Sequence, residues 1–196
     1  MDKSINYYLS LISPWSYLGH QRLVSIAKKH GASINVVPID FSVVFPSTGG
    51  IPLPKRSPQR KAYRMQELIR WRDHLDIPLN LEPAFFPTSV KLASSMVVKL
   101  RQSDPAAAID LAYACLHACW NEEKDISDQN TLLQIAKNMD LDGESLLMDI
   151  EDSLQRIAED SEHAIQNGIF GAPSYTYEDN IFWGQDRLEF LDRVLA

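Results

Sequence analysis

The sequence lacks the features that direct a chain to nucleic acid, to a membrane or to export. Its 196 residues carry 19 basic and 26 acidic side chains, a net charge of −7, without a stripe of lysine and arginine. Nucleic acid is therefore not an expected partner. No apolar run approaches the roughly 20 residues that cross a bilayer, and the first residues lack the apolar core of a signal peptide. We expect a cytoplasmic protein with no membrane partner.

Cysteine is scarce as well, with only Cys115 and Cys119 in the chain. They lie four residues apart in a segment of helical character, so both thiols share one helix face. A metal or redox pair with His117 is one interpretation. However, His117 points off that face and no further ligands lie nearby. We therefore expect two buried cysteines that act as small apolar residues, and no metal site.

The hydrophobic fraction of 45% is ample for one domain with a sizeable core, or for one domain that carries an insertion. Strands near 4–11 and 33–39 flank a helix near 15–30, which predicts a right-handed βαβ unit with a parallel strand pair. The segment 45–54 is rich in Gly and Pro and is predicted as a long exposed loop. Five helices are predicted after it, near 58–75, 89–102, 105–121, 128–138 and 143–166.

The last 30 residues return to β structure, with strands at 174–177 and 180–183 joined by a hairpin turn and followed by a helix near 186–195. This order predicts an α/β protein with a thioredoxin-like fold and an all-helical insertion. The thioredoxin-like domain is predicted at residues 1–52 and 166–196, and the helical insertion domain at residues 53–165.

The most informative segment is Ser13-Pro14-Trp15-Ser16, between the first predicted strand and the first predicted helix. It has the form of a thioredoxin-type Cys-x-x-Cys turn with serine at both cysteine positions. A helix N-terminus stabilises a thiolate, yet this turn supplies only hydroxyl groups. Disulfide exchange is nearly excluded, and a thiolate held here would arrive on a small thiol cofactor. The alternative is that both serines only cap the helix.

Two later segments fit such a site. Ala172-Pro173 enters a strand opposite the first turn, where a cis proline would present the backbone of Ala172 to an extended peptide. An ordinary proline of an edge strand is the alternative. Trp183-Gly184-Gln185-Asp186 links the last strand to the last helix, where a carboxylate and a helix N-terminus suit an α-amino and an α-carboxylate group. Simple capping by Asp186 is the alternative there.

Taken together, the chain resembles the 2-hydroxychromene-2-carboxylate isomerases and the related kappa-class glutathione transferases. The resemblance covers nearly the whole chain. It is carried by Ser13–Gly19, Gly168–Pro173 and Trp183–Leu188, with Thr48-Gly49 and Phe85-Phe86-Pro87. It implies a homodimer that uses glutathione in the catabolism of small aromatic compounds.

The resemblance also implies roles for individual residues. Ser13 would be the catalytic serine, whose hydroxyl donates a hydrogen bond to the glutathione sulfur; the role of Ser16 is left open. Backbone groups at Ala172 and Pro173 would pair with the cysteinyl part of the tripeptide. The γ-glutamyl end would lie against Trp183, Gly184, Gln185 and Asp186. The substrate pocket is predicted to include Trp15, Phe85 and Phe86.

Two positions depart from the family pattern. Aligned on Thr48-Gly49, Pro46 and Gly50 stand where the family often has a lysine and an asparagine that contact glutathione. Lys55 or Arg56 is a candidate replacement from further along the loop.

Three functions are compatible with this sequence. As an isomerase, the protein would use glutathione as a nucleophilic catalyst that opens the chromene ring and is regenerated. A glutathione transferase would use the same site on an electrophile and release a conjugate. A non-catalytic thioredoxin-like binding protein is the alternative from another class.

Overall fold

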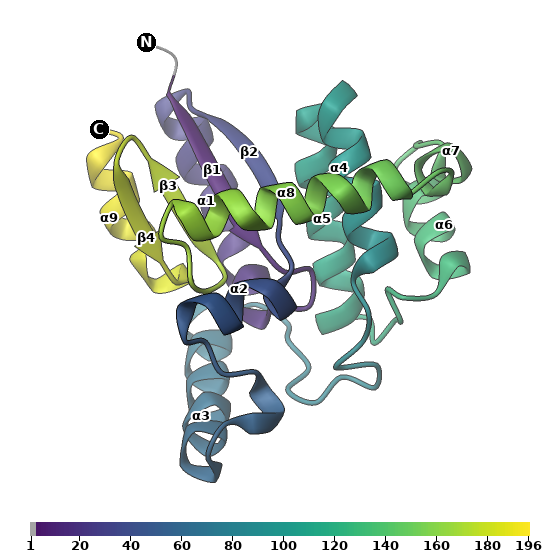
Figure 1. The fold of residues 1–196 in the computed structure, drawn as a ribbon. Helices are drawn as coiled ribbons and strands as arrows, with labels where there is room; N and C mark the ends of the chain where they lie inside the picture. The colour runs from purple at the N-terminus through teal and green to yellow at the C-terminus, as the bar shows by residue number, and fades with distance from the viewer. Residues whose placement is uncertain (1–2) are drawn as a thin grey trace.

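A mixed four-stranded sheet forms the centre of the protein, as the computed structural model of residues 3–196 shows (Figure 1). Its strands are β1 (Ser4–Leu9), β2 (Ser33–Pro38), β3 (Ser174–Tyr177) and β4 (Asn180–Trp183), in the order β2-β1-β3-β4. β1 pairs parallel with β2 and antiparallel with β3, and β3 pairs antiparallel with β4. This is the predicted thioredoxin-like α/β fold. The first two residues of the predicted N-terminal segment lie outside the described residues.

Helices cover both faces of the sheet. α1 (Pro14–His30) and α9 (Leu188–Val194) pack together on one face, where the inward side chains of β1, such as Tyr7 and Leu9, join the main apolar core. On the other face Tyr8 contributes to a smaller cluster under α2 (Phe41–Thr48) and α8 (Glu151–Gln166). Figure 1 shows α8 crossing in front of the sheet with α2 below it. Tyr7 and Tyr8 lie on opposite faces of the sheet because successive side chains of a strand point to opposite faces.

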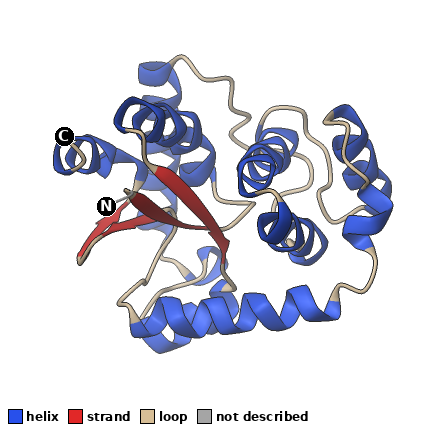
Figure 2. Cartoon of the chain, turned by 90° about the horizontal axis from the view of Figure 1, so that it is seen from above, coloured by secondary structure: helices blue, strands red, loops and turns tan. Residues whose placement is uncertain are grey.

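The remaining helices lie between β2 and β3 in the sequence. They are α3 (Pro58–Leu75), α4 (Lys91–Ser103), α5 (Pro105–Trp120), α6 (Gln129–Asn138) and α7 (Gly143–Leu147). α4 and α5 pack against each other and against β2, so the apolar core continues from the sheet into the helical block. Figure 2 shows the strands on one side and this block on the other. The predicted domain boundaries at residues 53 and 165 stay predictions.

Two elements differ from the sequence prediction. The loop predicted at 45–54 overlaps the second half of helix α2. Asp40 caps the start of that helix by accepting a hydrogen bond from the N–H of Ser42 at 2.8 Å. Gly49 then ends it in the left-handed conformation, with φ of 77°. Pro46 lies inside this short helix and leaves one of its backbone carbonyls without the usual hydrogen bond. A 3₁₀ turn, η1 (Leu53–Lys55), follows.

The second difference concerns the helix predicted over 143–166, which is two helices, α7 and α8. Met148 is extended and Asp149 has a positive φ of 48°, so the chain turns sharply between them. Neither Gly nor Pro marks this break in the sequence. α8 then starts with Glu151 and Asp152 in its first turn, where carboxylates stabilise the positive end of a helix.

Both cysteines are buried and free on α5. Burial raises the pKa of each thiol to about 12, so neither is ionised at neutral pH. Within residues 3–196, no cluster of three or more His, Cys, Asp and Glu side chains could hold a metal ion. None of the helices in this part of the chain is long and apolar enough to cross a membrane.

Gly19 lies where α1 crosses the segment after β4. A Cβ atom there would come 2.7 Å from Tyr175 Oη and 2.8 Å from Gln185 Cβ. Both distances are shorter than those that Cβ atoms keep from other heavy atoms in proteins. We expect Gly19→Val to lower the free energy of unfolding by about 1–3 kcal/mol, because the side chain overpacks this contact. Urea denaturation measures the change. Gln21→Val on the exposed side of α1 is the control and should change stability by less than about 0.5 kcal/mol. Equal stability of the two variants would contradict the prediction.

Candidate functional site

Ser13 is the N-cap of α1. Its Oγ accepts a hydrogen bond from the N–H of Ser16 at 3.2 Å, which leaves the hydroxyl proton available to a ligand. Pro14 has no N–H, so the N–H of Trp15 is the remaining donor of the first turn without a partner among residues 3–196. No acidic side chain lies in this turn. The arrangement offers two donors and the positive end of a 17-residue helix to an anion.

Ser16, the second serine of the turn, points the other way. Its side chain is fully buried, and its Oγ has no hydrogen-bond partner in the described part of the chain. The Tyr7 hydroxyl donates to the backbone carbonyl of Ser16 at 3.4 Å behind the helix. Ser16 therefore lies in the core, and only Ser13 of the two serines lines the cavity.

Ala172 lines the same cavity as Ser13. The peptide bond between Ala172 and Pro173 is cis, as the sequence predicted. Neither the N–H nor the C=O of Ala172 has a hydrogen-bond partner among residues 3–196. The carbonyl of Pro173 accepts from the N–H of Gly184 at 2.8 Å, which ties this segment to the third one. Ala172 thus presents one free donor and one free acceptor to an extended ligand.

The cavity at Ser13 has a volume of about 190 Å³ and mainly apolar walls. Trp15, Phe41, Phe45 and Phe86 line it together with Ile12. Phe86 is held in place by Trp120, with the two ring centroids 4.9 Å apart. Phe85, which the sequence also suggested, is 46% exposed and lines none of the cavities near Ser13.

A second cavity of about 350 Å³ adjoins the first and shares Trp15 and Ala172 with it. Its floor is the predicted segment Trp183, Gly184, Gln185 and Asp186, continuing to Arg187 in the 3₁₀ turn η2 (Gln185–Arg187). Tyr63, Glu67 and Trp71 on α3 form its other wall. The structure therefore brings the three predicted segments together around one cleft.

Gln185 is more constrained than its position in the sequence suggested. Its side chain is buried, and its Oε1 accepts a hydrogen bond from Arg22 of α1 at 2.6 Å. The amide nitrogen of Gln185 is therefore the part left for a ligand. Asp186 is exposed and forms an ion pair of 2.7 Å with the neighbouring Arg187. A pair this exposed exchanges readily for a ligand ammonium group.

Two arginines complete the cavity at Ser13, Arg56 and Arg64. Arg56 was a candidate from the sequence, whereas Arg64 on α3 was missed, because no local pattern marks which side of α3 meets the cavity. Lys55, the other candidate, is exposed and lies outside the cavity. Gly50 is needed where it stands, because a Cβ there would lie 2.2 Å from the ring of Phe45.

Comparisons with known proteins show which proteins this chain is similar to. A family model described as DSBA-like thioredoxin domain matches residues 4–196. The chain is 31% identical over 198 residues to a 2-hydroxychromene-2-carboxylate isomerase of Sphingobium xenophagum, covering 100% of this chain and 99% of the relative. It is 24% identical to glutathione S-transferase kappa 2 of Caenorhabditis elegans, over 99% of this chain and 92% of that protein.

The fold is also shared with a solved structure. A 2-hydroxychromene-2-carboxylate isomerase superposes with a TM-score of 0.85 at 24% identity, over 98% of this chain and 94% of that chain. The helical block between β2 and β3 is included in this coverage.

Proposed function

The chain belongs to the DSBA-like thioredoxin family, among the relatives of the 2-hydroxychromene-2-carboxylate isomerases and kappa-class glutathione transferases, and from this premise we propose that it is a glutathione-dependent isomerase of 2-hydroxychromene-2-carboxylate or a similar aromatic acid. One observation carries the proposal. The serine at the N-terminus of α1 and the unpaired backbone N–H and C=O of Ala172 line one cavity with aromatic walls.

The donors and acceptors of the cleft fit glutathione. Ala172 offers the N–H and C=O that the cysteinyl residue of a tripeptide pairs with. The amide of Gln185 and the carboxylate of Asp186 lie in the adjoining cavity and suit the two charged groups of the γ-glutamyl end. Ser13 and the N–H of Trp15 remain as donors for the sulfur.

When bound, glutathione would supply a thiolate that adds to a conjugated carbon of the substrate and leaves after the ring has opened and a single bond has rotated. The residues of the chain support this chemistry in separate ways. Ser13 donates its proton in a hydrogen bond that favours the ionised sulfur. Phe41, Phe45 and Phe86 exclude water and pack on the rings of the substrate.

Arg56 is proposed to replace the missing lysine contact by binding the glycyl carboxylate of glutathione. It lines the cavity on the side of η1, and its Nε–H already donates to the carbonyl of Ile51 at 2.8 Å, which fixes the side chain. We expect Arg56→Met to weaken glutathione binding about fivefold, since an ion pair open to solvent contributes about 1 kcal/mol. Lys55→Met, one residue away and outside the cavity, should leave it unchanged.

Calorimetric titration with glutathione and with γ-glutamylcysteine, which lacks the glycyl carboxylate, measures this effect. Arg56→Met should affect only the binding of glutathione. An equal loss for both ligands would contradict the assignment of Arg56 to the glycyl carboxylate.

The function itself is tested by incubating the protein with glutathione and 2-hydroxychromene-2-carboxylate. The expected product is trans-o-hydroxybenzylidenepyruvate, with the glutathione concentration unchanged. Consumption of glutathione with chlorodinitrobenzene, without isomerisation, would instead favour the transferase. Absence of glutathione binding at millimolar concentration would reject both activities and leave the non-catalytic binding protein.

A further inference from the structure

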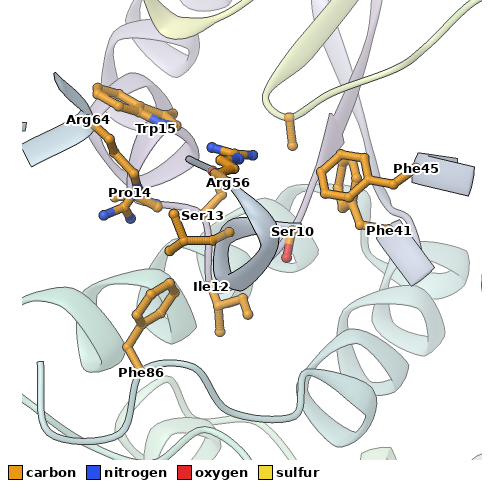
Figure 3. A pocket seen from close by; sticks show the side chains of 12 residues that line it. Ser10, Ile12, Ser13, Pro14, Trp15, Phe41, Phe45, Arg56, Arg64 and Phe86 are labelled. Carbon is orange, nitrogen blue, oxygen red and sulfur yellow. The ribbon is translucent and has the colours of Figure 1, made fainter. Parts of the chain in front are cut away.

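Arg64 has an unusual environment on the inner side of α3. Its guanidinium lies 5.7 Å from the ring centroid of Phe86, a cation–π distance, and lines the cavity of Ser13. Figure 3 shows it beside Pro14, between Trp15 and Phe86. Arg64 is partly buried, whereas Arg60, one turn earlier on the same helix, is exposed and does not line this cavity.

Within the described residues 3–196, this guanidinium has no partner of opposite charge. Over residues 3–196, no carboxylate lies within ion-pair distance of Arg56, Arg60 or Arg64, and the one hydrogen bond from Arg64 goes to the weak acceptor Sδ of Met65 at 3.8 Å. Glu67, one turn further along α3, is paired with Arg70.

Burial, and secondarily the charge of Arg56, lower the pKa of Arg64 to about 10, so it stays protonated at neutral pH but in an unfavourable setting. A partly buried cation beside a like charge is stabilised by an anion that it can bind. The aromatic walls and the charge together suit a planar carboxylic acid.

We propose that Arg64 binds a carboxylate of the substrate and thereby restricts the enzyme to anionic aromatic substrates. The inference rests on the proposed function, since it takes the cavity at Ser13 as the place where the substrate reacts. Arg64 lines that cavity but not the adjoining one, where the γ-glutamyl end is proposed to bind. A carboxylate on Arg64 therefore keeps the rest of the molecule within the cavity that Ser13 lines.

The test uses an unreactive probe and needs neither glutathione nor turnover. Chromone-2-carboxylate and the neutral chromone are titrated by calorimetry into the wild-type protein, Arg64→Met and the control Arg60→Met. Arg64→Met should bind chromone-2-carboxylate about 10- to 100-fold more weakly, since hydrogen bonds to charged groups are lost. Chromone should bind all three proteins alike, and Arg60→Met should resemble the wild type.

Arg64→Lys provides a second variant that keeps the charge but lacks the planar fork, and an intermediate loss is expected. Unchanged affinity of Arg64→Met for chromone-2-carboxylate would overturn the proposal. The proposal would also be overturned if Arg64→Met lost affinity for glutathione but not for γ-glutamylcysteine, because Arg64 would then bind the glycyl carboxylate of glutathione. If the probe binds as expected and the wild type does not isomerise the chromene, the proposed function fails while this anion site stands.

Discussion

Turnover should fall to the uncatalysed rate when ophthalmate, which has a methyl group in place of the thiol, replaces glutathione. The turn at Ser13 and Ser16 contains only hydroxyl groups, and both cysteines are buried on α5 with raised pKa values. The chain therefore has no nucleophilic sulfur of its own at the cleft. The contacts proposed at Ala172 and Gln185 do not involve the thiol, so ophthalmate should still bind.

Two measurements check this prediction: the isomerisation rate at saturating ophthalmate, and calorimetric titration of the same ligand. Glutathione added back in excess is the control and should restore the rate. Isomerisation that continues with ophthalmate at the rate seen with glutathione would mean that the sulfur takes no part. Ser13 and its neighbours would then act on the substrate directly.

Ser13→Ala should lower the turnover number about 10- to 150-fold. That range corresponds to the 1.5–3 kcal/mol that a hydrogen bond to a charged group typically contributes. Because Ser13 also caps α1 through the N–H of Ser16, the substitution should cost about 1 kcal/mol of folding stability as well. The comparison is made by steady-state kinetics at saturating glutathione, well below the unfolding temperature.

Two variants separate the catalytic effect from the loss of the cap. Ser13→Thr keeps a hydroxyl and should retain most of the turnover. Asp128→Ala removes the N-cap of α6, which accepts from the N–H of Thr131 at 2.8 Å, and lies in the helical block. It should lose similar stability without losing turnover. A turnover number for Ser13→Ala within twofold of the wild type would reject the role of Ser13.

Much of the fold could be predicted because its signals are local. Asp104 with Pro105, Asp128 and Asp142 mark helix starts that the structure confirms, each through a side-chain cap. Helix α2 was missed because Gly and Pro dominate its surroundings, while its stability comes from the buried Val44 and a distant packing partner, α8. Tertiary contacts of this kind leave no periodic pattern in so short a segment.

In the site, too, residues with a local sequence signal could be predicted, whereas residues placed by tertiary contacts could not. Ser13, Ala172 and Asp186 could be found because each lies in a short segment with its own turn or cap signal. The bond from Arg22 to Gln185 joins residues 163 positions apart, and no local pattern announces it. Arg64 enters the cavity only because α3 packs against α1, with Leu68 of α3 fully buried.

The most direct test of the central claim is the pKa of the glutathione thiol when it is bound to the protein, measured by the ultraviolet absorbance of the thiolate across a pH titration. Free cysteine thiols have a pKa of about 8.5. With Ser13 and the N-terminus of α1 as donors, the pKa of the bound thiol should be at least about one unit lower, since one unit corresponds to about 1.4 kcal/mol. Ser13→Ala should raise it back toward the free value. A bound thiol that titrates like free glutathione in the wild-type protein would contradict the account.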